Sequence, residues 1–187
     1  METKIKLLLC ILLFKSIAYC QNDYTVLEES IYSTIKFHDV LLTDIKNTSG
    51  TNSGMATLFP IDQNNTQTGM TLQDPNGVVV ETYGQEIGEL HKEFLYNSGL
   101  KITFANDDDD QVLEVVDIVA NIISINGQVL ETGDSISNLT SINYTICNGI
   151  DNYKYVDIIK VGHDAAPITI SLDDNNIITK IHYYVEP

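Results

Sequence analysis

The stretch "NGVVVETYGQEIGEL" at residues 76–90 decides the expected fold, because "NGQVLETGDSISNL" at residues 126–139 nearly repeats it. With one gap, eight of fourteen aligned positions are identical. Asn-Gly favours a tight two-residue hairpin turn because both residues tolerate positive φ. The β-favouring residues after it predict a returning strand, which the following Gly ends. "QEIGEL" and "DSISNL" then predict the start of a helix, since Ile and Leu three apart share one helical face.

A second pair of similar stretches follows the first. "ITFANDDDDQVLEVVDIV" at 102–119 aligns without gaps to "ITISLDDNNIITKIHYYV" at 168–185. Each predicts a strand, an Asp/Asn turn and a longer strand. We therefore predict two tandem similar units, 69–119 and 121–187, each with the order β-turn-β-α-β-turn-β. The alternative is chance similarity between hairpins.

The segments between the paired stretches differ in the two predicted units. In the first unit, Ile87, Leu90, Phe94 and Leu95 share one face of a predicted helix, and Gly99 stands where a C-terminal cap belongs. In the second unit, "YKYVDIIKV" at 153–161 predicts an added strand.

The N-terminal region, residues 21–68, carries weaker signals. "IKFHDVLLTDI" at 35–45 predicts a strand, whereas "YTVLEESIYSTI" at 24–35 fits either a helix or the start of that strand. "NTSGTNSGM" at 47–55 and "QNNTQTG" at 63–69 predict loops. The expected fold class is α+β: an antiparallel β-sheet with two or three short helices packed on one face.

Residues 1–20 have the order of a secretory signal peptide. Lys4 and Lys6 form a positive start, and Leu7–Phe14 is an apolar run too short to span a bilayer. Small residues at the first and third places of Ala18-Tyr19-Cys20 predict cleavage after Cys20. We expect a secreted or periplasmic protein.

The "IAYC" stretch at 17–20 also resembles a bacterial lipobox, although Tyr19 departs from the small residue wanted there. That resemblance implies an alternative, in which Cys20 is lipidated and anchors the protein to the outer membrane. Either outcome leaves Cys147 as the single internal cysteine, so we expect no intrachain disulfide.

The charge of the chain limits its partners. The formal net charge is −16, and the ten basic residues are all Lys. Removal of residues 1–20 takes away Glu2 and three Lys, which leaves about −18. Such a chain repels nucleic acid and lacks the Arg that reads phosphates and base edges. A basic protein, a cation or a neutral ligand remains possible.

Few residues suggest metal or catalytic chemistry. The run Asp107, Asp108, Asp109 and Asp110 is a weak cation candidate, but it lacks the ligand spacing of an EF-hand and fits a solvated turn. His38 and His163 each precede an Asp, but nothing in the sequence brings the two pairs together. His91 lies on the apolar face of the predicted helix, and His182 alternates outward beside Lys180. No catalytic or cofactor motif occurs.

Tyrosines suggest an interaction surface. The interface candidates, Tyr153, Tyr155, Tyr183 and Tyr184, cluster in strands of the second unit. Ordinary strand composition explains them equally well. We expect a non-catalytic exported binding or scaffold protein without cofactor. An inhibitor or immunity-type protein that covers a basic protein partner is the alternative, and an uncharacterised hydrolase is the least favoured.

Overall fold

The computed structural model describes residues 24–48, 50–59, 78–83, 90–96, 98–105, 113–149, 153–163, 165 and 167–185. Within them the protein is mostly β, with two sheets and three short α-helices, and the α+β composition is confirmed. The helices are α2 (Glu29–Tyr32), α3 (Leu42–Lys46), α4 (Asn52–Leu58) and the 3-10 helix η1 (Ile136–Asn138). The strands are β1 (Thr25–Leu27), β2 (Lys36–Phe37), β3 (Val40–Leu41), β4 (Val78–Tyr83), β5 (Leu90–Leu95), β6 (Lys101–Ala105), β7 (Glu114–Ala120), β8 (Ile122–Ile125), β9 (Gln128–Glu131), β10 (Cys147–Asn148), β11 (Lys154–Lys160), β12 (Ile168–Leu172) and β13 (Ile178–Tyr184).

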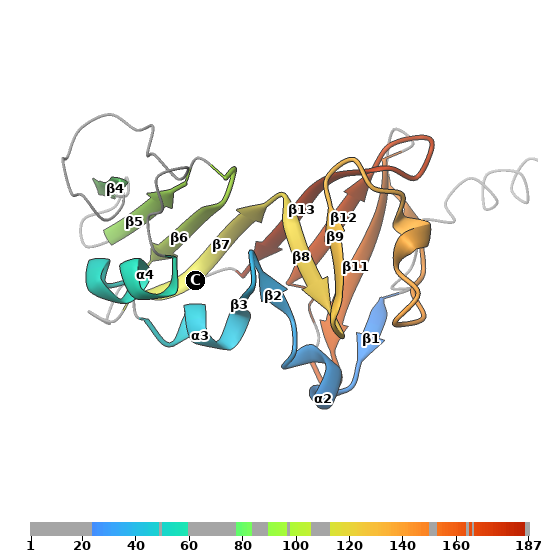
Figure 1. The fold of residues 1–187 in the computed structure, drawn as a ribbon, viewed down its shortest axis with the longest axis horizontal. Coiled ribbons are helices and arrows are strands. Elements are labelled where there is room, and N and C mark those ends of the chain that lie inside the picture. The colour runs from blue at the N-terminus through green and yellow to red at the C-terminus, as the bar shows by residue number, and fades with distance from the viewer. Residues whose placement is uncertain are drawn as a thin grey trace, which may run out of the picture.

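The larger sheet has nine described strands in the order β1-β11-β12-β13-β7-β6-β5-β4, with β10 also paired to β11 (Figure 1). Its neighbours are antiparallel except at one edge, where β1 and β11 pair in parallel from Thr25↔Ile158 to Leu27↔Lys160. The sheet is therefore mixed, and the expected purely antiparallel sheet is corrected. Parallel pairing needs a long connection, which the chain between β1 and β11 supplies.

The smaller sheet is antiparallel, with the described order β3-β2-β8-β9. The chain passes from the larger sheet into it at Asn121, between β7 and β8. β8 and β9 are joined by Asn126 and Gly127, whose φ values are 50° and 78°. The Asn-Gly hairpin predicted here is therefore confirmed. Its counterpart at 76–77 lies outside the described residues.

The two sheets share one hydrophobic core. Phe37 and Ile123 of the smaller sheet are fully buried, as are Ile118 and Ile170 of the larger sheet. Burial alternates along the central strands of the larger sheet, so that one face packs on this core. The other face is left for the polar residues described below.

The helix predicted through Leu90, Phe94 and Leu95 is wrong, because Leu90–Leu95 forms strand β5. β4 and β6 pair with its two sides, and this pairing outweighs a weak local helical preference. Phe94 is buried against Phe104, with ring centroids 5.8 Å apart. Gly99 is not a helix cap; it has a φ of 84° in the β5–β6 turn.

The single strand predicted at 35–45 is also corrected. β2 and β3 have two residues each and turn at His38 and Asp39, whose φ values are 48° and 68°. α3 then begins at Leu42. Two adjacent non-glycine residues with positive φ are uncommon, and here they form the hairpin turn that residue pattern alone did not reveal.

Two further N-terminal segments differ from expectation. Residues 24–35 divide into β1 and α2. The loop predicted at 47–55 is corrected in part, because α4 begins at Asn52, and Thr51 caps it by accepting a hydrogen bond from Gly54 N at 3.2 Å. A Thr cap followed by small polar residues resembles a loop in composition, which explains the error.

The tandem repeat is not shown and stays a prediction. β6–β7 and β12–β13 are both hairpins of the larger sheet, as their similar sequences predict. However, β4 of the predicted first unit lies in the larger sheet, while β9 of the second lies in the smaller one. The strand predicted at 153–161 is confirmed as β11.

Candidate functional site

The side chains that point away from the shared core form the outer face of the larger sheet. The outer face includes Tyr155, Asp157, Thr169, Ser171, Lys180, His182, Tyr184, Asp117, Lys101 and Glu93. Its residues stand opposite one another on neighbouring strands, as in the row Asp157, Thr169 and His182. Because these strands pair with a neighbour on both sides and pack on the core, the backbone beneath the face is held rigidly.

Aromatic side chains lie at both ends of the outer face. Tyr153 precedes β11 and stacks on Tyr155, with ring centroids 5.4 Å apart and an interplanar angle of 24°. Tyr153 is 45% exposed and Tyr184 is 50% exposed. Strand spacing places the Tyr155 and Tyr184 backbones roughly 16 Å apart, since they are four residues and two strands apart. Tyr183 points the other way and is 2% exposed, so it belongs to the core.

A hydrogen-bonded polar network occupies the middle of the outer face. Asp117 Oδ2 lies 2.8 Å from Lys101 Nζ, and Asp117 Oδ1 lies 2.6 Å from His182 Nε2. Burial acts to lower the pKa of Lys101, but the hydrogen bond and charge of Asp117 outweigh it and raise that pKa. The network links β6, β7 and β13 and holds their side chains in fixed positions.

A second polar pair lies on β11 and β12. Thr169 Oγ1 donates a hydrogen bond to Asp157 Oδ1 at 2.6 Å. Burial raises the pKa of Asp157, and the Thr169 hydrogen bond opposes this shift. The outer face carries Lys101 and Lys180 against the carboxylates of Asp117, Asp157 and Glu93. The face itself therefore has a formal charge of −1, in a chain of −16.

The His182–Asp117 pair resembles half of an acid–base arrangement, and the part of the chain that the structure describes adds no nucleophile to it. The imidazole nitrogen Nε2 is occupied by Asp117, and no described hydroxyl or thiol is hydrogen-bonded to His182. Nucleophilic catalysis needs a base within hydrogen-bonding reach of its nucleophile. The contact with Asp117 fixes the orientation of the His182 ring within the face. Residue pattern alone does not reveal this pair, because the two residues are 65 positions apart.

The acidic turns are only partly described. Asp107–Asp110 lie outside the described residues. The related turn between β12 and β13 is closed by Asp173 Oδ1, which accepts hydrogen bonds from the backbone N–H groups of Asn175 and Ile177, each at 2.8 Å. This carboxylate has a clear structural task in the turn. The described residues contain no group of three or more His, Cys, Asp or Glu side chains arranged to hold a metal.

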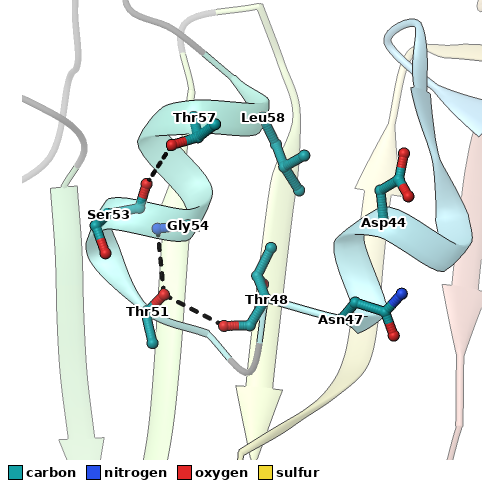
Figure 2. Close-up of a pocket in the computed structure, with 8 residues that line it drawn as sticks. All are labelled: Asp44, Asn47, Thr48, Thr51, Ser53, Gly54, Thr57 and Leu58. Atoms are coloured by element: carbon teal, nitrogen blue, oxygen red, sulfur yellow. Dashed lines mark hydrogen bonds between the residues drawn. The ribbon is translucent and has the colours of Figure 1, made fainter.

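A depression of about 520 Å³ lies over α3 and α4 (Figure 2). Figure 2 shows the hydroxyl groups of Thr51 and Thr57 hydrogen-bonded to neighbouring backbone. Thr57 Oγ1 donates to Ser53 O at 2.8 Å, and Thr51 Oγ1 donates to Thr48 O at 3.3 Å. These donors stabilise the start and the turns of α4, so we assign the depression no ligand.

The remaining predicted site residues lie apart. Cys147 is buried on β10, and His163 follows β11, where it lines a cavity treated below. His38 lies in the β2–β3 turn beside Asn121, and its Nε2 is buried and meets the geometry of a hydrogen bond with no other described residue. Burial lowers the pKa of His38, although the Asn121 amide and nearby carboxylates oppose this shift.

We expect the stability of the protein to fall as the pH drops from 7 to 5, and the substitution His38→Asn to reduce this fall. The lowered pKa of His38 means that the folded chain resists protonation, while the unfolded chain takes up the proton below about 6.5. The contribution of neutral, buried His38 to the stability is thus fully present above about pH 6.5, and it is lost as the pH falls below that value. Asn tolerates the positive φ of position 38, which limits side effects. Urea denaturation at several pH values tests this, and equal pH dependence of parent and variant would contradict it.

Searches against protein families, characterised proteins and solved structures find no match to this chain. Among the helices of the described residues, none is long and apolar enough to cross a membrane. The geometry of the outer face is therefore the main basis for a functional proposal.

Proposed function

We propose that the protein is a non-catalytic exported binding protein that recognises a protein partner through the outer face. The observation that carries the proposal is the exposure of Tyr153 and Tyr184 at the two ends of a rigid, hydrogen-bonded sheet surface. Tyrosines contribute large contact areas with little loss of conformational entropy, and they are enriched in protein interfaces.

The charge of the chain supports a basic partner. The sequence has 26 acidic residues against ten Lys, so its overall field attracts a positively charged protein. On the outer face, Asp117 is paired with Lys101 and His182, so the charge in its middle is compensated within the face when a partner displaces water. In this proposal the whole chain steers the encounter, and the face makes the contact. Residues 1–20 support export, followed by cleavage after Cys20 or lipidation of Cys20.

Inhibition of a basic enzyme is the second candidate function. The acidic charge of the chain also supports inhibition, and an inhibitor would contact the enzyme through the outer face. The two differ in the partner: an inhibitor has one dominant enzyme partner whose activity falls on binding, whereas a scaffold leaves the activity of its partners unchanged.

We expect the variant Tyr153→Ala/Tyr184→Ala to release its partner at least about tenfold faster than the parent, since interface tyrosines often contribute 1–2 kcal/mol or more. The immobilised exported protein would be used to capture partners from the extract of the compartment in which it is found. Dissociation rates of the main captured protein would then be measured by surface plasmon resonance. Association is expected to slow as salt rises, because salt screens charge steering.

The matched control is Val129→Ser on β9, where the side chain is also 50% exposed but belongs to the smaller sheet. It should leave the dissociation rate unchanged. If the tyrosine variant and the parent release the partner equally fast, the outer face is not the contact surface. A salt-independent association rate would remove the steering part of the proposal.

We also infer from the sequence that units 69–119 and 121–187 derive from one duplicated unit. The adjacent hairpins β6–β7 and β12–β13, each with a register shift, support this inference. A crystal structure in which Asn76 and Gly77 form a two-residue hairpin turn, as Asn126 and Gly127 do, would test it. An extended chain at 76–77 would contradict the duplication.

A further inference from the structure

A cavity of about 290 Å³ lies on the other side of the larger sheet, apart from the outer face. Its walls come from α2, which lies at the lower edge of Figure 1, from α3, and from the ends of β11 and β13. At roughly 30 Å³ per water molecule in the liquid, this volume suits a ligand of about ten non-hydrogen atoms. The cavity is thus smaller than typical cofactor sites.

The interior of the cavity is apolar and aromatic. Leu42 and Tyr183 are buried, and Tyr32 and Pro167 are half-buried beside them. Burial raises the pKa of Tyr183 to about 12, with a smaller effect of Glu114, and burial likewise raises the pKa of Tyr32. Both phenols therefore stay neutral at physiological pH. Neither hydroxyl is hydrogen-bonded to another described residue, so both can donate to a ligand.

The rim of the cavity carries cationic groups. Lys46, Lys160 and His163 line it, and Glu29 is the single carboxylate among its lining residues. Glu29 Oε2 lies 2.5 Å from Lys160 Nζ, so this pair is neutral overall. No ion pair joins Lys46 to another described residue. With His163 neutral, the lining carries a formal charge of +1 in a chain of −16.

This distribution of groups sets the chemistry of a ligand. An apolar, aromatic interior takes an apolar body, and ring–ring contacts favour an aromatic one. Lys46, the rim cation without an ion pair to another described residue, can form one ion pair with a negatively charged group of the ligand. A dianion would exceed the available positive charge, and a cation would be repelled by Lys46.

We propose that this cavity binds a small aromatic monocarboxylate, with its ring against Tyr32 and Tyr183 and its carboxylate at Lys46. The site is separate from the outer face, so its test does not depend on the proposed protein partner. The Glu29–Lys160 ion pair limits the positive charge of the rim and thereby sets the preference for a single negative charge.

The probe is phenylacetate, which has about ten non-hydrogen atoms and so fits the estimate from the cavity volume. We expect it to cause saturable shifts of the backbone amide signals of Tyr32, Lys46 and Tyr183 in two-dimensional NMR, with a Kd below about 10 mM. Phenylacetamide, which has the same shape without the charge, should bind at least about tenfold more weakly. Acetate, which lacks the ring, should bind weakly as well.

Three variants locate the site. Lys46→Gln should weaken phenylacetate binding at least about tenfold, whereas Lys180→Gln, with the same charge change on the outer face, should leave it unchanged. Glu29→Gln should strengthen binding about two- to tenfold, because it frees Lys160. The proposal fails if phenylacetate gives no saturable shifts at these residues. Equal binding of phenylacetamide, or equal losses from Lys46→Gln and Lys180→Gln, would also overturn it.

Discussion

Replacement of Phe104 by alanine is expected to lower the free energy of unfolding by about 3–5 kcal/mol, the range for large aromatic truncations in cores. Phe104 on β6 is fully buried and meets Phe94 edge to face, with an interplanar angle of 81°. Truncation removes this contact and leaves a cavity between the sheet and the α3–α4 connection. Urea denaturation at neutral pH measures the change.

The conservative variant Phe104→Leu provides the comparison. It keeps the site apolar and mostly filled, so it should cost less than Phe104→Ala. If the alanine variant loses less than about 1 kcal/mol, Phe104 does not lie in a packed core, and the assignment of β6 to the shared core is wrong.

The substitution Gly50→Ala is expected to destabilise the protein by about 2–4 kcal/mol. Gly50 has a φ of 63°, which costs a non-glycine residue about 1 kcal/mol. A Cβ atom here would also lie 2.8 Å from Phe104 Cγ, a clash that overpacks the core and costs about 1–3 kcal/mol. Urea or thermal denaturation measures the total.

A second glycine separates these two contributions. Gly127 has a φ of 78°, but an added Cβ would meet nothing within 4 Å. Gly127→Ala should therefore cost only about 1 kcal/mol. Phe104→Leu should relieve part of the Gly50→Ala effect, so the double variant should be more stable than additivity predicts. Equal losses from Gly50→Ala and Gly127→Ala would show that position 50 is open.

Local signals made part of the fold predictable. The hairpin β12–β13 and the flanking strands β6 and β7 follow from alternating apolar residues on both sides of Asp/Asn runs. Asn126 and Gly127 adopt the positive φ values that their residue types favour. In these segments the local preference and the tertiary arrangement agree.

Other features depend on contacts that sequence pattern does not contain. β5 is a strand because β4 and β6 pair with it, although Leu90, Phe94 and Leu95 also fit a helical face. Which sheet a hairpin joins depends on the whole topology. The chain leaves the larger sheet at Asn121, and the hairpin β8–β9 that follows belongs to the smaller sheet. Local propensity cannot decide between these outcomes.

The outer face likewise combines features that local pattern predicts with features that depend on tertiary contacts. Alternation along β13 puts Tyr183 and Tyr184 on opposite faces, and only the position of the core decides that Tyr184 is the exposed one. The contacts of Asp117 with Lys101 and His182 join three strands. Such a network becomes visible only when the strand order and register are known.

The parallel pairing of β1 with β11 determines when the larger sheet can be completed. Thr25 stands opposite Ile158, so β1 has no partner strand until the ribosome has synthesised the chain as far as β11. Contacts between residues so distant in sequence form slowly, because closing the intervening loop loses much entropy. β1 therefore waits without its partner strand while the segments between it and β11 are synthesised, and its backbone N–H and C=O groups stay unpaired in the sheet until then.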